Sequence, residues 1–171
     1  MSAVNQEERQ KIEYWIVGFT DGEGCFSVSF LRNATNKLGW QVFPEFVITQ
    51  GGKSLPALKI FKKYFKCGKI FINKRYDNHN ENLYRFCVRA LNDLSKKIIP
   101  FFKNHQLKTM KKKDFIIFCE IIEMMKKKEH HNFQGMKKIA KLVETMNRKK
   151  PSRFFESSET IRRTSALRRK I

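Results

Sequence analysis

The sequence predicts an α+β fold with one antiparallel sheet, helices on one face of that sheet and further helices toward the C-terminus. Two observations predict this class. Hydrophobic residues recur at helical spacing in some segments and alternate at strand spacing in others. These segments follow the order helix, two strands, helix, two strands, helices, which is typical of an α+β protein. At 171 residues, we expect a single domain over positions 1–171.

The first helix is expected over about residues 5–22. Asn5 and Glu8 have the spacing of a capping box, which favours a helix start at that point. The hydrophobic residues that follow share one helical face: Ile12, Trp15, Ile16 and Phe19. The glycines of the segment Asp21-Gly22-Glu23-Gly24 should end this helix.

The sheet is expected within about residues 24–90, as two pairs of strands. The first pair spans 25–33 and 40–50, and Pro44 predicts an edge or a bulge. The second pair spans 69–76 and 83–89, across a polar turn. The residues expected to face the core are Phe26, Val28, Phe30, Trp40, Val42, Phe46, Ile48, Ile70, Ile72, Tyr84, Phe86 and Val88.

The remaining helices come between the strand pairs and over residues 91–171. One is expected from Ser54 as its N-cap to Gly68 just past its end. Another spans about 91–103, where Pro100 leaves the end open. Two more helices are expected, one with Phe115 to Met125 and one with Met136 to Met146. A last helix is expected to start near Ser157, after a basic linker over 149–153.

Charge is the strongest compositional signal. The chain carries 36 Lys and Arg against 16 Asp and Glu, a formal net charge of +20. Self-repulsion of this size favours a polyanionic partner, and nucleic acid is the natural one. The alternative is a generic basic surface, as in a ribosomal-type protein.

Other classes of protein and site are disfavoured. No apolar run reaches the roughly 18 residues that a membrane span needs, and the N-terminal segment is typical of neither a signal nor a transit peptide. The four cysteines have no zinc-site spacing, so we expect buried free thiols in a reducing compartment. We interpret His130-His131 as solvated rather than as metal ligands.

The predicted sheet has a polar second face that suits the DNA major groove. The side chains expected to bind DNA from this sheet are Ser27, Ser29, Asn33, Gln41, Glu45, Lys69, Asn73, Arg75, Arg85 and Arg89. The basic run before the last helix adds Lys149, Lys150 and Arg153, which suit phosphate contacts.

The segment Trp15-Ile-Val-Gly-Phe-Thr-Asp-Gly-Glu-Gly24 resembles the motif of the LAGLIDADG homing endonucleases. The match is close at Gly18, Asp21, Gly22, Glu23 and Gly24, with Glu23 in place of the usual final Asp. The resemblance continues through Phe46 to Gln50, Leu107 to Phe115 and Ser157 to Arg162. It implies an αββαββα fold with a saddle-shaped sheet and extra C-terminal helices.

The motif also predicts an assembly. Gly18 and Gly22 are four residues apart, and small residues at this spacing let two helices approach closely. One motif in the chain implies two chains about a two-fold axis. The expected homodimer interface holds Trp15, Gly18, Phe19 and Gly22. The alternative interpretation is a glycine-rich helix stop.

The acids of the motif favour metal chemistry. Asp21 and Glu23 lie at a helix C-terminus, where the macrodipole disfavours negative charge and a cation relieves the cost. We expect Glu23 and the Gly24 carbonyl to hold Mg²⁺, with Mn²⁺ able to substitute. The resemblance implies that Gln50 and Lys111 complete a catalytic site with Glu23, with Lys108 and Lys112 as rivals to Lys111.

The resemblance implies hydrolysis of both strands of double-stranded DNA at a long pseudo-palindromic site, leaving short 3′ overhangs. Two alternatives of the same fold stay open: an intron RNA-splicing maturase and a non-catalytic DNA-binding protein. Because the family often resides in organellar introns, the expected location is a chloroplast or a mitochondrion.

Overall fold

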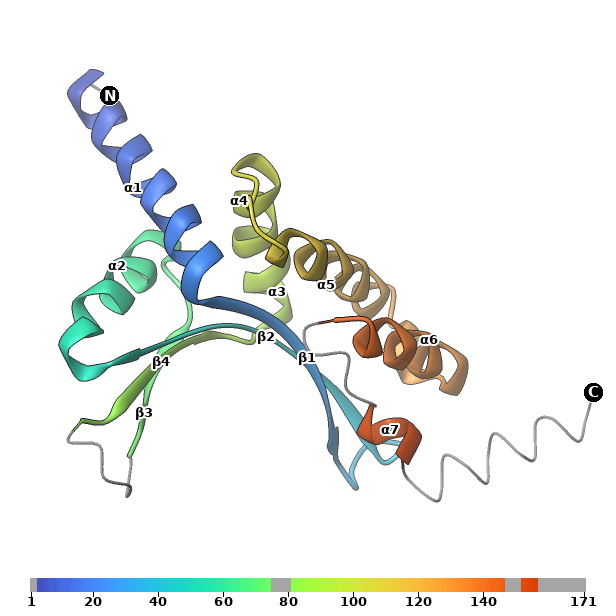
Figure 1. Ribbon diagram of the computed structural model, residues 1–171. Helices are drawn as coiled ribbons and strands as arrows, with labels where there is room; N and C mark the ends of the chain where they lie inside the picture. Colours follow the sequence, from blue (N-terminus) through green and yellow to red (C-terminus); the bar gives the residue numbers. More distant parts are fainter. Residues whose placement is uncertain (1–2, 75–80, 147–151, 157–171) are drawn as a thin grey trace, which may run out of the picture. The chain divides into compact units, whose positions relative to one another are not determined.

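The computed structural model describes residues 3–74, 81–146 and 152–156. Within them the elements run helix, two strands, helix, two strands, helices, so the predicted α+β class is confirmed (Figure 1). The chain forms two compact units, each described below by itself. Residues 1–27 and 45–115 belong to the first unit, and residues 28–44 and 116–171 to the second. The expectation of one domain stays a prediction.

The first helix, α1 (Ala3–Glu23), ends directly at the first strand, as the motif glycines predict. Its start differs from the prediction, because the helix already includes Ala3 when it reaches Asn5. Asn5 therefore has helical neighbours on both sides, and the capping-box interpretation of Asn5 and Glu8 is wrong.

The sheet has four strands in the order β1-β2-β4-β3. They are β1 (Gly24–Arg32), β2 (Trp40–Gly51), β3 (Lys69–Asn73) and β4 (Leu83–Val88). The β2–β4 ladder begins at the pair Phe46–Val88, so Pro44 lies beyond the stretch that β4 covers, at an edge as predicted.

The two faces of the sheet differ as the alternation predicts. On the inner face, Phe26, Phe46 and Phe86 are buried. We call the opposite side, which carries Ser27, Glu45 and Arg85, the outer face. Ile72 lies on the same face as Ile70 and Phe86, as predicted, but it is 56% exposed and so is not part of the core. It pairs with Tyr84 near the end of the edge strand β3.

The helix α2 (Leu55–Phe65) covers the inner face with Leu58, Phe61 and Phe65, as predicted. Ser54 is at the N-cap position but its side chain makes no capping hydrogen bond. The C-terminal prediction is wrong by two residues, because Lys66 takes the left-handed conformation at φ 49° and the helix ends there. Gly68 also has a positive φ, +78°, and leads the chain into β3.

Residues 91–104 form one helical run with a wide turn inside it. It consists of α3 (Leu91–Asp93), a π-helical turn η2 (Leu94–Ile98) and α4 (Ile99–Asn104). Pro100 is in the first turn of α4, where a missing N–H is tolerated. The π turn before it shifts the hydrogen-bonding pattern, so the run continues past the proline.

Aromatic rings fill the core of the first unit. Phe26 stacks on Phe46 with centroids 4.9 Å apart, and Phe102 meets both rings. The rings of α2 join them through Phe61 and Phe86 at 6.0 Å. This packing joins the strands β1, β2 and β4 and the helices α2 and α4 into one core.

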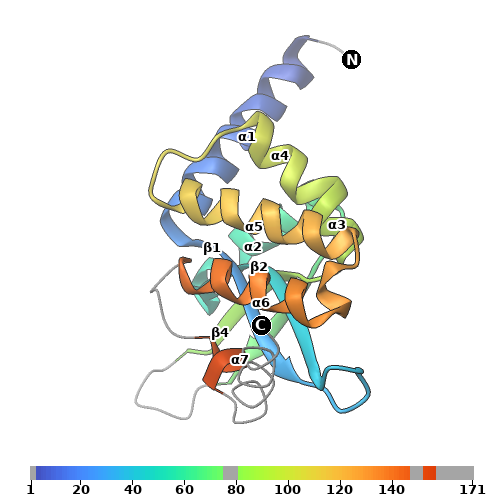
Figure 2. The same ribbon diagram turned by 90° about the vertical axis from the view of Figure 1, so that its right-hand side faces the viewer.

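The second unit combines the β1–β2 hairpin with α5 (Lys111–Lys126, from residue 116), the turn η3 (Glu129–His131), α6 (Phe133–Glu144) and α7 (Arg153–Glu156). In both views α5 and α6 lie side by side (Figures 1 and 2). The short helix α7 begins at Arg153, the last residue of the predicted basic linker, and its Phe154 ring packs on Phe30 and Trp40 with centroids 5.3 and 5.9 Å apart. The predicted last helix from Ser157 lies outside the described residues.

Within residues 3–74, 81–146 and 152–156, no helix is both long and apolar enough to cross a membrane.

Candidate active site and nucleic-acid interface

The motif ends at a tight junction between α1 and β1. Gly24 is buried, and a Cβ on it would lie 2.6 Å from Thr20 Cγ2 and 2.9 Å from the Thr20 carbonyl oxygen. Distances this short are forbidden by steric overlap, so only glycine fits there. The junction therefore fixes the backbone beside Glu23, which is exposed at the last residue of α1.

Asp21 binds the loop that precedes α5. Its carboxylate accepts hydrogen bonds from the Lys108 N–H at 2.8 Å, the Thr109 N–H at 3.1 Å and the Thr109 hydroxyl at 2.7 Å. Burial alone would raise the pKa of Asp21, but these donors and Lys111 outweigh burial and lower it. Asp21 thus orients this loop as an anion.

Lys111 reaches the end of the motif helix. Its Nζ donates to the carbonyl oxygens of Asp21 at 2.8 Å and Gly22 at 2.7 Å. Carbonyls in the last turn of a helix lack partners further along the helix, and an ammonium group there also suits the helix dipole. The Lys111 ammonium group therefore lies at the backbone of the two residues before Glu23, and its catalytic role stays a prediction.

The two rival lysines have other contacts. Lys112 Nζ donates to the Gln106 side chain at 2.9 Å, and Lys108 contributes its backbone N–H to Asp21. Gln50 is half-buried near the end of β2, opposite Tyr84 of β4. Within the described residues, no hydrogen bond joins the side chains of Gln50, Glu23 and Lys111 to one another, and Lys111 contacts the backbone next to Glu23 at the Gly22 carbonyl.

The outer face of the sheet differs from the open polar surface expected. Ser29, Lys69 and Asn73 are exposed, as a DNA-reading role requires. Glu45 is only 6% exposed. Its carboxylate accepts from Arg85 at 2.8 Å and from Arg89 at closer range, and its backbone carbonyl accepts from the Ser27 hydroxyl at 3.5 Å. Pairing between strands was not visible in the sequence pattern, which showed only that these residues share a face.

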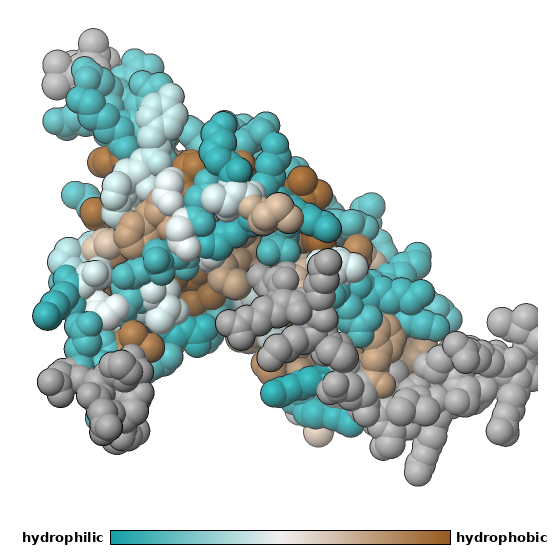
Figure 3. All heavy atoms as spheres, viewed as in Figure 1, coloured by the Kyte–Doolittle hydropathy of each residue, from teal (hydrophilic) through white to brown (hydrophobic). Residues whose placement is uncertain are grey.

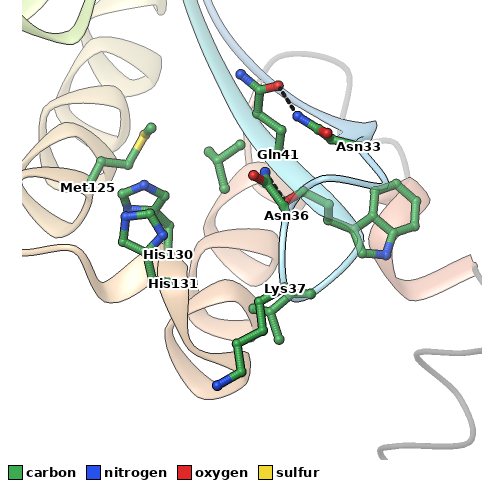
Figure 4. A pocket seen from close by; sticks show the side chains of 10 residues that line it. Asn33, Asn36, Lys37, Gln41, Met125, His130 and His131 are labelled. Atoms are coloured by element: carbon green, nitrogen blue, oxygen red, sulfur yellow. Dashed lines mark hydrogen bonds between the residues drawn. The ribbon is translucent and has the colours of Figure 1, made fainter.

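The tip of the β1–β2 hairpin holds two more predicted DNA contacts. The Asn33 side chain donates to Gln41 Oε1 at 3.2 Å, and both line a hollow of about 290 Å³ (Figure 4). His130 and His131 form the opposite wall, with ring centroids 4.0 Å apart. The prediction that this pair is solvated is wrong for His130, because its Nδ1 atom is buried. Burial lowers the pKa of the His130 ring, and the neighbouring His131 lowers it further.

The predicted dimer face of α1 is open in the single chain. A Cβ on Gly18 or Gly22 would meet nothing within 4 Å in the described residues. Trp15 is 38% exposed, and its ring packs on Phe19 at 4.9 Å. In the space-filling view, hydrophilic residues cover the N-terminal turns of α1, while intermediate and hydrophobic residues gather over its C-terminal half (Figure 3).

Three predicted DNA-binding residues, Arg75, Lys149 and Lys150, lie outside the described residues. Arg153 is exposed on α7.

Comparison with known families settles the class of protein. The family model described as LAGLIDADG endonuclease matches residues 16–122, from the motif helix to the middle of α5. The chain belongs to the LAGLIDADG endonuclease family. The match includes Glu23, Gln50 and Lys111 and the whole sheet. The family resemblance and the fold expected from it are therefore confirmed.

Relatives and solved structures agree with this assignment. Probable intron-encoded endonuclease 2 of Neurospora crassa is 34% identical over 133 residues, which is 78% of this chain and 28% of that protein. The homing endonuclease I-TnaI is 36% identical at a TM-score of 0.70, over 92% of this chain and 96% of that one. The LAGLIDADG homing endonuclease I-LtrWI, solved bound to target DNA, is 32% identical at a TM-score of 0.77, over 86% and 48%.

The matched proteins differ in length. The chain spans about a quarter of the Neurospora relative and about half of the I-LtrWI chain, but nearly all of I-TnaI. One copy of this fold therefore corresponds to about half of the longer DNA-bound structure.

Proposed function

We propose that this protein is a sequence-specific double-strand DNA endonuclease that acts as a homodimer with a divalent metal ion. The observation that carries the proposal is the contact of the Lys111 ammonium group with the backbone carbonyls of Asp21 and Gly22, the two residues before Glu23 in the motif helix. A carboxylate and an ammonium at one site suit phosphodiester hydrolysis, which needs a metal ligand and a positive charge near the phosphate.

DNA is the proposed substrate. The net charge of +20 suits a polyanion. The outer face carries the side-chain types that bind base edges, including Arg85, Arg89 and Asn73. The related endonuclease I-LtrWI was solved bound to target DNA, which supports the same partner for this chain.

The metal site would draw on oxygen ligands. Glu23 contributes an exposed carboxylate and Gly24 a carbonyl at a junction that excludes any larger residue. Oxygen ligands suit Mg²⁺. Among the residues that the structure describes, no group of three or more His, Cys, Asp or Glu lies together. A second Glu23 from a partner chain would supply the carboxylate that one copy lacks.

A bound divalent ion would polarise the phosphate and lower the pKa of water at the site. Lys111 would neutralise the charge that develops on the phosphate. Gln50, at the end of the second strand, would orient the attacking water. We propose cleavage across the minor groove with short 3′ overhangs, as in the family.

The proposal of a homodimer rests on the open face of α1. Its exposed face has two glycines with open space above them, and a second α1 would fill that space. The solved DNA-bound I-LtrWI chain is about twice as long as the matched region, so two copies of this chain would match its size. Because the Neurospora relative is named as intron-encoded, we also propose synthesis within a mitochondrion or chloroplast.

The test is cleavage of a randomised DNA duplex library by the purified chain, with Mg²⁺ in one arm and Ca²⁺ in another. We expect both strands to be cut at one pseudo-palindromic site with Mg²⁺. With Ca²⁺ we expect binding to that site without cutting, since the related I-SmaMI was solved on uncleaved DNA with calcium. Binding to intron RNA with no DNA cleavage would favour a maturase, and selective DNA binding without cleavage would favour a non-catalytic binder.

A further inference from the structure

Glu45 joins side chains from three strands on the outer face. Its Oε1 accepts from the terminal Nη2 of Arg85 at 2.8 Å, and its Oε2 accepts from Nε of Arg89. The Arg89 guanidinium also lies over the ring of Phe71 on β3, 4.9 Å from its centroid. A carboxylate from β2 thus links Arg85 of β4 to Arg89, which directly follows β4 and stacks on Phe71 of β3.

The strand register shows how far Arg85 reaches. Arg85 pairs with Thr49, which is four residues from Glu45 along β2, a distance of about 13 Å between backbones. To meet Glu45, the Arg85 side chain extends along the sheet, over the pair Val47–Cys87. Those two residues are 8% and 3% exposed, although they lie on the outer face. The arginine is therefore held flat against the sheet.

Stability alone is a weak reason for this cluster. A carboxylate that is 6% exposed loses most of its hydration, and ion pairs in such places often contribute little net stability. The partners Arg85 and Arg89 remain 32% and 39% exposed, so each guanidinium still faces solvent. What the cluster does provide is a fixed direction for two long side chains.

We propose that Glu45 is a positioning residue that holds Arg85 and Arg89 in the orientation in which they read guanine edges. This inference rests on the proposed DNA-binding function and deepens it. Glu45 is only 6% exposed and each of its carboxylate oxygens already accepts from an arginine, so we assign base reading to the two arginines rather than to Glu45. When arginine reads guanine, its planar guanidinium must be aligned with O6 and N7, and an arginine that is already aligned loses less conformational entropy on binding.

The inference predicts opposite changes in two quantities. Glu45→Gln removes one negative charge from a DNA-facing surface, so affinity for unrelated DNA should rise slightly. The same change frees both arginines from their anchor, so preference for the correct base should fall. A residue with a purely structural role would lower both affinities together, and a purely electrostatic role would leave the preference unchanged.

The experiment measures binding of the full chain to the best duplex, its single-base variants and an unrelated duplex, with Ca²⁺ and at several salt concentrations. We expect Glu45→Gln to lose about tenfold of discrimination, at the positions that Arg85→Ala and Arg89→Ala also affect. The matched control is Glu123→Gln, which changes the charge equally on the exposed surface of α5. It should raise affinity for unrelated DNA with no change in preference.

A second variant tests the inference without altering Glu45. Arg89→Lys keeps the charge but loses the planar group, so discrimination should fall while affinity for unrelated DNA stays the same. Unchanged preference in both Glu45→Gln and Arg89→Lys would overturn the inference while the proposed function stands. A wild-type chain with no base preference would overturn both.

Discussion

The Lys111 side chain contacts two carbonyls at the end of α1, and its neighbours in the chain contact neither. Consecutive helical residues point about 100° apart, so at most one of them faces the site. We predict that Lys111→Met lowers the cleavage rate by about 100-fold or more, the scale of losing one charge-stabilising group, with little change in DNA affinity. Lys112→Met is the matched control, and single-turnover kinetics is the measurement. Equal losses in both variants would contradict a specific role.

Asp21 gives a prediction on pH. Its pKa is lowered in the folded chain, so the folded state favours the anion. Its contribution to stability is therefore full above the ordinary Asp value of about 3.9 and is lost as pH falls through the lowered value. We expect Asp21→Asn to lower the free energy of unfolding by roughly 1 kcal/mol at pH 7, and the gap to close at lower pH. Urea unfolding of both chains from pH 2 to 7 is the measurement; a gap independent of pH would be the contrary result.

These single residues also show what a sequence can and cannot place. Gly18, Gly22, Glu23 and Gly24 carried the motif in the sequence and lie where it predicted, because a motif depends on local spacing. The choice of Lys111 among three lysines and the burial of Glu45 depend on segments far apart in the chain. Asp21 is 88 residues from Thr109, and Glu45 is 44 residues from Arg89. Spacing along one strand or helix does not contain such pairs.

At the scale of the element, alternation and helical spacing located the strands and helices, and their ends were harder to predict. The end of α2 falls at Lys66 rather than at Gly68, since a lysine adopts the left-handed turn. The run 91–104 passes Pro100 because a π turn precedes it. Ile72 alternates like a core residue but lies near the end of an edge strand. In each case tertiary context overrides a local rule.

The prediction of a homodimer is tested by substitutions in the helix α1. Gly22 has open space above it in the single chain, so Gly22→Leu should leave the protomer folded and obstruct a second α1. Overpacking a helix interface costs about 1–3 kcal/mol per chain, and sedimentation velocity should show the dimer dissociating. Circular dichroism should stay as in the wild type. Gly24→Ala is the contrasting variant, because it clashes with Thr20 inside the protomer and should destabilise the fold itself. An intact Gly22→Leu dimer would place the interface elsewhere.

The whole molecule combines a net charge of +20, a sheet whose outer face carries Arg85 and Asn73, and a motif helix that ends at Glu23. The family is shown by the match over residues 16–122. The central proposal is that Glu23 supports DNA cleavage. The same residue has no place among the proposed base-reading side chains of the sheet, so cleavage and binding should be separable.

Glu23→Gln tests that proposal most directly. The substitution keeps the size of the side chain at an exposed position and removes only the charge that a divalent ion needs. On the site selected by the wild-type chain, we predict that Glu23→Gln binds with unchanged base preference and shows no cleavage with Mg²⁺. Cleavage by Glu23→Gln at close to the wild-type rate would contradict the account.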